Sequence, residues 1–242
     1  MGHLTFDKCG NHNSFTRSKA RDYILALNSI LRPGESSMLL PSGDLCSLQR
    51  GITSERNNIV SRIIGISGSL RRGSFNTALL RAALELMPNG AELNIESIAG
   101  IPLYNGDMEA AEGIPQRVAE LKRAITEADG LLLSTPEYNN SMPGVLKNAV
   151  DWLSRPASDI KAVFRGKPVA VMGASPGGFG TILSQNAWLP VLRTLGTKPW
   201  FGGRLLVSRA QTVFDEHGKM TDKALRKQLE QFLHGFLEFV RM

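Results

Sequence analysis

From position 59 onward, short apolar runs alternate with segments in which apolar residues recur every three to four positions. The runs are rich in leucine or β-branched residues and end at turn-forming residues, which is typical of buried strands. They predict strands at 60–66, 93–98, 130–134, 168–172 and 204–207. The periodic segments predict helices at 77–87, 116–128, 145–152, 182–195 and 221–240, the last with Thr221 or Asp222 as its N-cap.

Strands that alternate with helices of this length indicate right-handed βαβ units and a parallel sheet. Five strands in a domain of this size predict an α/β fold of the flavodoxin-like type. It is a doubly wound five-stranded parallel sheet of order 2-1-3-4-5 with helices on both faces. Ligands of such sheets bind beyond the carboxyl ends of the strands. We therefore expect the chemistry in the loops after the first, third and fourth strands, and a long polar loop without helix after the second.

Residues 1–58 differ from the rest of the chain. Asparagine, serine, glycine and arginine are frequent there, and the one helical period is short and ends at Pro33-Gly34. We interpret 1–58 as a poorly ordered N-terminal extension and 59–242 as the working domain. An organelle transit peptide is the alternative, but such peptides are poor in acidic residues. The acidic residues of this segment argue against it: Asp7, Asp22, Glu35 and Asp44.

Composition and charge narrow the class of protein. The chain has 242 residues with two cysteines, too few for a disulfide framework, and it has no apolar stretch long enough for a transmembrane helix or a secretory signal. We therefore expect a reduced, cytoplasmic protein without a membrane partner. The net charge is +6, but the basic residues are scattered and no run of five like charges exists, which disfavours a nucleic-acid partner.

The first candidate loop, residues 68–76, reads GSLRRGSFN. Gly68 and Gly73 have the spacing of a nucleotide-binding P-loop, but Ser74-Phe75 stands where that motif requires Lys-Ser/Thr. The loop is nevertheless rich in hydroxyl, amide and backbone N–H groups at the start of a helix, which suits a phosphate monoester. The alternative is plain helix capping by Ser74 or Asn76.

The second and third loops have turn-forming sequences. Residues 134–144 read STPEYNNSMPG, in which Pro136 and Pro143 restrict the backbone and Tyr138 offers an aromatic face, as a flat ligand requires. Residues 173–180 read GASPGGFG, and such glycines let a backbone approach a ligand closely. A surface turn and a flexible connection are the respective alternatives.

The second loop continues into a helix, and residues 136–152 read PEYNNSMPGVLKNAVDW. Together, residues 68–76, 136–152 and 173–180 resemble the NADPH-dependent FMN reductases, in the branch of chromate and quinone reductases. The resemblance covers about residues 60–241, and it implies a flavodoxin-like fold, non-covalent FMN, NADPH or NADH as co-substrate, and a homodimer or homotetramer. It implies two-electron reduction of quinones, with chromate or azo compounds as incidental acceptors. By position in the motifs, the FMN phosphate would be held by Ser69, Arg71, Ser74, Asn76 and Thr77. The ring would be lined by Pro136, Glu137, Tyr138 and Asn139 on one edge and by Ser175, Gly177 and Gly178 on the other.

Flavin chemistry also accounts for the lack of histidine and cysteine in the three loops, because the cofactor carries the reaction and the protein orients it. A serine hydrolase would also need a histidine after the strand-end loops, and His217 is the only candidate for it. We expect no catalytic side chain and no metal, and interpret the Glu137 carboxylate as structural rather than as an acid. A one-electron carrier and a reductase that releases reduced FMN remain the rival functions.

Overall fold

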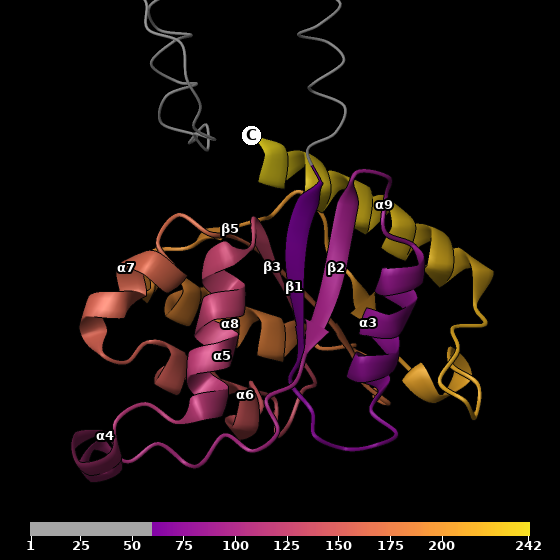
Figure 1. The fold of residues 1–242 in the computed structure, drawn as a ribbon. Helices are drawn as coiled ribbons and strands as arrows, with labels where there is room; N and C mark the ends of the chain where they lie inside the picture. The colour runs from indigo at the N-terminus through magenta and orange to yellow at the C-terminus, as the bar shows by residue number, and fades with distance from the viewer. Residues whose placement is uncertain (1–59) are drawn as a thin grey trace, which may run out of the picture. The chain divides into compact units, whose positions relative to one another are not determined.

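The computed structural model describes residues 60–242, so the predicted extension at 1–58 lies outside the described residues. Its centre is a parallel sheet of order β2-β1-β3-β4-β5 (Figure 1). The long strands are β1 (Ser61–Ser67), β2 (Ala91–Glu96), β3 (Gly130–Ser134) and β4 (Pro168–Ala174). The predicted fold class and strand order are confirmed.

The edge of the sheet beyond β4 differs from the prediction of one strand at 204–207. Two short strands pair with β4 there: β5 (Lys198–Pro199) at its start and β6 (Leu206–Val207) at its end. Between them the chain leaves the sheet, and the ring of Trp200 packs edge-on against Phe232, with ring centroids 4.9 Å apart. Gly202 makes room, since a Cβ there would lie 2.5 Å from the Trp200 ring nitrogen. The chain leaves the sheet directly after Trp200, whose N–H still donates to the Val169 carbonyl at 2.8 Å.

Helices cover both faces of the sheet, as predicted. One face carries α3 (Phe75–Glu85) and α9 (Lys223–Arg241), the latter capped by Asp222, and the other carries α5 (Gln116–Glu127), α6 (Gly144–Leu153) and α8 (Ile182–Thr194) (Figure 1). Successive residues of β1 supply both cores, because Ile63 packs toward α3 and Ile64 toward α5. Burial on both faces explains why the strands read as continuous apolar runs.

The helix between β2 and α5 was not predicted. The helix α4 (Gly106–Glu112) lies in the segment expected to be a polar loop, and none of its residues is buried. Its stability comes from its ends: Asn105 accepts a hydrogen bond from Asp107 N, and acidic residues occupy the first turn. A helix without a fully buried residue carries only a weak apolar period, which the sequence pattern does not reveal.

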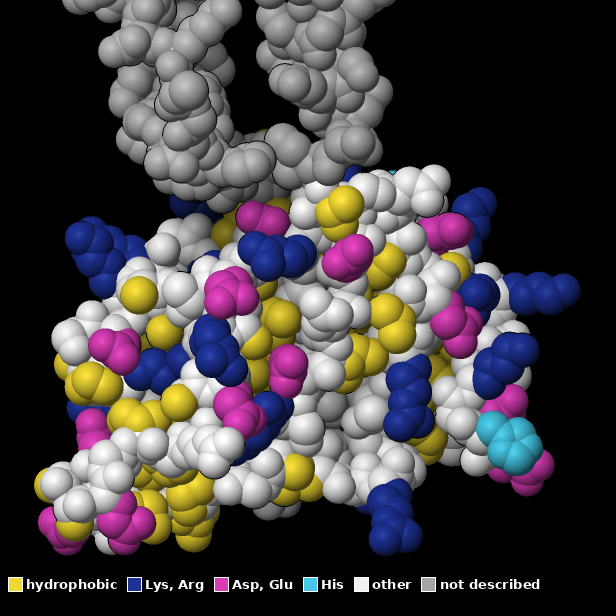
Figure 2. All heavy atoms as spheres, viewed as in Figure 1, with side chains coloured by type: hydrophobic (Ala, Val, Ile, Leu, Met, Phe, Trp, Pro, Cys, Tyr) yellow, Lys and Arg dark blue, Asp and Glu magenta, His cyan; other side chains and the backbone are white. Residues whose placement is uncertain are grey.

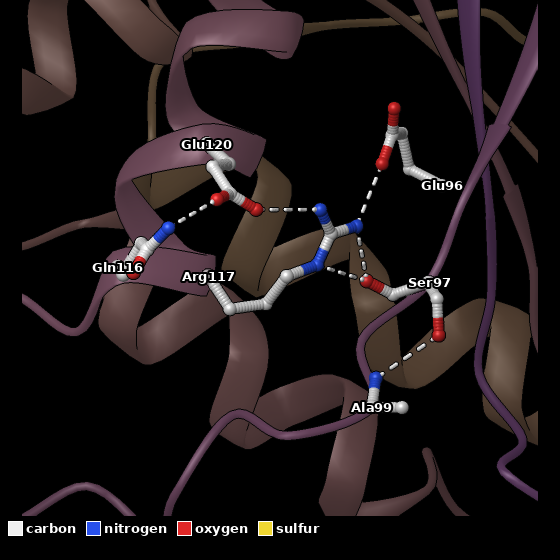
Figure 3. A network of polar contacts seen from close by, with 6 residues as sticks. All are labelled: Glu96, Ser97, Ala99, Gln116, Arg117 and Glu120. Carbon is white, nitrogen blue, oxygen red and sulfur yellow. Dashed lines mark hydrogen bonds and ion pairs between the residues drawn. The ribbon is translucent and has the colours of Figure 1, made fainter.

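An arginine fixes the end of β2 to the start of α5 (Figure 3). Arg117 Nη2 donates to Glu96 Oε2 at 2.6 Å and to the Ser97 carbonyl at 2.7 Å, and Nη1 donates to Glu120 Oε2 at 3.3 Å. The hydrogen bond with Glu96 raises the pKa of Arg117. Gln116 Nε2 holds the second oxygen of Glu120 at 3.0 Å. These bonds are on the rim of the sheet and are structural.

Two short elements complete the second face: η1 (Ala157–Asp159) and α7 (Ile160–Val163), which connect α6 to β4. The buried ammonium of Lys122 on α5 binds Asp159 and the carbonyl of Arg155, and its hydrogen bond lowers the pKa of Asp159. A further turn, η2 (Ala210–Thr212), follows β6.

Within residues 60–242, no helix combines the length and apolarity needed to cross a bilayer. Figure 2 shows basic and acidic side chains interspersed on the visible face.

Candidate functional site

The three candidate loops begin side by side at the carboxyl ends of β1, β3 and β4, at the lower edge of the sheet in Figure 1. Backbone bonds join their first residues: Gly68 N donates to the Ser134 carbonyl at 2.8 Å, and Thr135 N donates to the Met172 carbonyl at 2.9 Å. Gly68 is required for this contact, because a Cβ would lie 2.8 Å from a ring carbon of Pro136. The expected meeting of the loops is confirmed.

The first loop ends in a capped helix. Ser74 is the N-cap of α3, and its Oγ accepts from Thr77 N at 3.2 Å, so the capping interpretation is correct for Ser74. The first intrahelical bond runs from Ala78 N to the Ser74 carbonyl. The N–H groups of Phe75 and Asn76 precede that bond and have no acceptor within residues 60–242. Among the described residues, capping therefore leaves two N–H groups free at this helix end, which suits an anion, so capping by Ser74 does not exclude the predicted phosphate site.

The remaining residues of the first loop differ in what they offer. Arg71 is exposed, and its guanidinium carbon lies 5.4 Å from the centroid of the Phe75 ring. The Ser69 hydroxyl oxygen accepts from Arg71 N at 3.3 Å. Thr77 donates its hydroxyl to Ser67 Oγ at 3.0 Å, so that proton is already engaged. Arg71 and Ser69 thus face the open side, whereas the Thr77 hydroxyl is tied to the end of β1.

The side chain of Asn76 does not point where a ligand of the phosphate would. It is 3 % exposed, and its carboxamide points into the protein. Its Nδ2 donates to the Ala174 carbonyl at 2.9 Å, and its Oδ1 accepts from Ala174 N at 3.0 Å and from Ser134 Oγ at 3.1 Å. Three of the four hydrogen-bonding positions of the amide are therefore occupied by protein groups.

The second loop contains a tight hairpin. Tyr138 and Ser141 exchange two backbone hydrogen bonds of 3.1 and 3.0 Å, and the residues between them, Asn139 and Asn140, have φ of 50° and 60°. Positive φ at both central positions defines a type I′ turn, which asparagine tolerates well. The turn leaves Tyr138 48 % exposed, with its hydroxyl 3.5 Å from Ser69 Oγ. The tyrosine thereby reaches from the second loop to the first.

The Glu137 carboxylate caps helix α8, although Glu137 itself belongs to the second loop. Its Oε2 accepts from Leu183 N at 2.8 Å and from Ser184 N at 3.1 Å, which are orphan donors of the first turn of α8. Thr181, the formal N-cap, makes no capping bond with its side chain. The carboxylate therefore joins the second loop to α8, which agrees with the structural role expected for Glu137.

The third loop is held along its length by the chain after β6. Ser175 N donates to the Val207 carbonyl at 2.9 Å, Ala210 N to the Ser175 carbonyl at 3.0 Å, and Arg209 N to the Gly177 carbonyl at 2.9 Å. At Gly173 a Cβ would lie 2.0 Å from Thr181 Oγ1, whereas at Gly178 nothing lies within 4 Å. The loop is thus packed at its base, while its tip presents exposed glycine backbone.

A buried hydroxyl cluster beneath the second loop was missed by the sequence analysis. Thr135 Oγ1 and Ser184 Oγ lie 2.8 Å apart, and Trp188 Nε1 donates to Thr135 Oγ1 at 3.1 Å. All three residues are fully buried. Their spacing in the sequence contains no signal for this contact, because β3 and α8 meet only in the folded chain. The cluster attaches α8 to the floor of the site.

The site thus combines a cradle for an anion at α3, a rigid hairpin with an exposed tyrosine, and an exposed glycine backbone opposite. These features suit a flat ligand that carries a phosphate, and each stands on a loop packed against its neighbours. Neither described histidine, His217 nor His234, belongs to the three loops. The side chains are arranged to bind and orient a group that supplies its own reactivity.

Comparison with known proteins identifies the family. Residues 61–212 match the family described as NADPH-dependent FMN reductase. The chain is 44% identical over 180 residues to an NAD(P)H-dependent FMN reductase of Pseudomonas aeruginosa, a match that covers 74% of this chain and 95% of the relative. It is 37% identical over 185 residues to a quinone reductase of Escherichia coli, covering 74% and 95% of the two chains.

A solved structure agrees with these relatives. The flavoenzyme NAD(P)H:(acceptor) oxidoreductase FerB of Paracoccus denitrificans superposes with a TM-score of 0.67 at 32% identity, over 75% of this chain and 97% of that one. The match spans nearly the whole of that chain. Residues 61–212, which match the family, include all three loops. The chain therefore belongs to the NADPH-dependent FMN reductase family.

Proposed function

We propose that the chain is an FMN-dependent NAD(P)H oxidoreductase that reduces quinones by two-electron transfer. The observation that carries this proposal is the meeting of the three loops around the free N–H groups of Phe75 and Asn76. Family membership supports it, as do relatives named for FMN reduction and for quinone reduction. FMN, when bound, supplies the capacity to accept a hydride from a reduced nicotinamide and to pass it to a second substrate.

The phosphate end of the site would use mainly neutral donors. We assign to the phosphate the N–H groups of Phe75 and Asn76 and the hydroxyl protons of Ser69 and Ser74, whose oxygens accept bonds within the loop. The exposed Arg71 adds one positive charge beside them. A helix N-terminus with hydroxyl groups around it binds a dianion well, because donors and helix dipole act together.

The ring end would be lined by backbone and by one aromatic side chain. Pro136, Tyr138 and Asn139 lie on the hairpin side, and Gly177 and Gly178 lie on the opposite side. Tyr138 can cover a flat ring system, and the exposed N–H groups of the glycine tip can donate to ring carbonyls. The Glu137 carboxylate is held by two N–H donors of α8, so its role is to position the hairpin.

The acceptor is proposed from the names of relatives. One relative is a quinone reductase of Escherichia coli and another, 37% identical over 180 residues, is a 2-hydroxy-1,4-benzoquinone reductase of a Burkholderia species. We propose a quinone-like acceptor here too, with chromate and azo compounds as incidental ones. From the composition we further propose a cytoplasmic location.

We also propose a homodimer or homotetramer. The outer faces of α6, α8 and the third loop expose large apolar side chains: Val145, Leu183, Leu189 and Phe179, the last 83 % exposed. Exposed apolar side chains that gather on neighbouring elements are typical of interfaces. Sedimentation or light scattering of the purified chain tests the assembly, and a monomer at micromolar concentration would refute it.

The test of cofactor binding is direct. We expect the purified protein to be yellow and to release FMN on denaturation, identified by chromatography. Retention of FMN through gel filtration would favour a quinone reductase over a reductase that releases reduced FMN. A colourless protein that binds no added FMN would overturn the proposal.

A further inference from the structure

The side chain of Asn76 touches all three loops of the site. It stands in the first turn of α3, next to the proposed phosphate cradle. Its partner Ser134 is the last residue of β3, two residues before the hairpin loop starts at Pro136, and its partner Ala174 is the last residue of β4, directly before Ser175. These contacts join positions 58 and 98 residues apart in the chain.

The contacts with Ala174 are paired in a way that fixes orientation. The carboxamide donates to the carbonyl and accepts from the N–H of the same residue, at 2.9 and 3.0 Å. Two parallel bonds between planar groups restrain rotation as well as distance. Because Asn76, Ser134 and Ala174 are all buried, water cannot replace these bonds when they are lost.

From this geometry we infer that Asn76 is a positioning residue which couples the phosphate end of the FMN site to its ring end. Its backbone N–H serves the phosphate, while its side chain sets the starting points of the hairpin and glycine loops. The inference rests on the proposed FMN site. It differs from the role implied by the family motif, in which the side chain would contact the phosphate.

The two roles make opposite predictions for riboflavin, which lacks the phosphate. A phosphate ligand affects FMN alone, whereas a positioning residue affects both flavins, because both require the ring loops. We expect Asn76→Ala to weaken FMN and riboflavin by comparable factors of about tenfold or more. Ser74→Ala is the matched control, and we expect it to weaken FMN by about tenfold and riboflavin hardly at all.

The measurement is titration of each flavin by fluorescence quenching, with visible circular dichroism of bound FMN as a second readout. Asn76→Ala should change the dichroism bands, because the surroundings of the ring move, although Asn76 does not touch the ring. Ser74→Ala should leave their shape unchanged. A loss for FMN alone in Asn76→Ala, with unchanged bands, would overturn the inference and restore the side chain as a phosphate ligand.

A second variant covers the case in which Asn76→Ala does not fold. Ser134→Ala removes one bond to Asn76 Oδ1 and leaves the pair with Ala174 intact. We expect it to weaken both flavins by about threefold and to shift the dichroism bands. Unchanged affinities and bands would contradict the coupling. If the wild-type chain binds neither flavin, the proposed function itself fails, which separates the two failures.

Discussion

Replacement of Glu137 by alanine tests whether a carboxylate on one loop stabilises the helix behind it. The residue is half-buried, and one oxygen accepts from two N–H groups of the first turn of α8, at 2.8 and 3.1 Å. Within residues 60–242 no other side chain caps this helix end, because Thr181 is turned to Gln185. The alanine variant therefore leaves both donors to water.

The expected magnitude follows from measured helix caps. Loss of a capping side chain costs about 0.5–2 kcal/mol of the free energy of unfolding. For a domain of 150–250 residues, each kcal/mol lowers Tm by about 2–4 °C, so we expect a fall of about 1–8 °C. Glu137→Gln keeps one acceptor oxygen but loses the attraction of a charge to the helix dipole, about 0.3–1 kcal/mol, and should melt between the two.

The assay is thermal unfolding of the flavin-free protein, which separates helix stability from cofactor binding. Glu92→Gln on the exposed side of β2 is the control for removal of one negative charge, and we expect its Tm to be unchanged. The order wild type, Glu137→Gln, Glu137→Ala should also appear in FMN affinity, because the hairpin loop loses its tie to α8. A Tm of Glu137→Ala within 1 °C of Glu92→Gln would show that the cap does not contribute and would refute this reasoning.

Three further outcomes are expected. Gly173→Ala should abolish soluble expression or lower Tm by more than about 10 °C. Gly178→Ala, which has open space around its Cα, should melt like the wild type. Equal behaviour of the two variants would contradict the packing at the base of the third loop. Because Lys122 lowers the pKa of Asp159, that carboxylate stabilises the fold above its ordinary pKa and loses this effect as the pH falls through the lowered value. The Tm gap between wild type and Asp159→Asn should therefore be full at pH 7 and shrink below about pH 4, and a constant gap would contradict the ion pair. A chain that begins at Asn57 should keep its FMN and melt within a few degrees of the full chain, and loss of soluble protein would show that the removed segment belongs to the fold.

The sequence predicted the layers of this fold because burial on both faces of a parallel sheet leaves a strong pattern. The run at 130–134 matches β3 residue for residue, and the helix at 116–128 matches α5 to within one residue. The helix α4 carries no such pattern because none of its residues is fully buried and only Met108 packs, partly buried, against the core. The division of the edge strand into β5 and β6 depends on pairing with the two ends of β4, which the local sequence does not determine.

The sequence predicted which loops form the candidate site, but not the hydrogen bonds that hold them. The carboxyl ends of parallel strands lie at one edge of the sheet. The alternation of strands and helices was therefore enough to predict that the three loops meet. The direction of a side chain depends on contacts across the fold. The Asn76 carboxamide and the Glu137 carboxylate both bind residues more than 40 positions away, and neither spacing forms a local motif.

The central claim is two-electron turnover on a bound FMN, and an anaerobic titration followed in the visible spectrum tests it most directly. Addition of NADPH to the purified protein should bleach the oxidised flavin bands in one step, and addition of an equimolar benzoquinone should restore them with formation of hydroquinone. Little or no absorbance of a neutral semiquinone should appear at any point. Strong accumulation of that semiquinone, or a flavin that NADPH does not reduce, would contradict the account and favour a one-electron carrier.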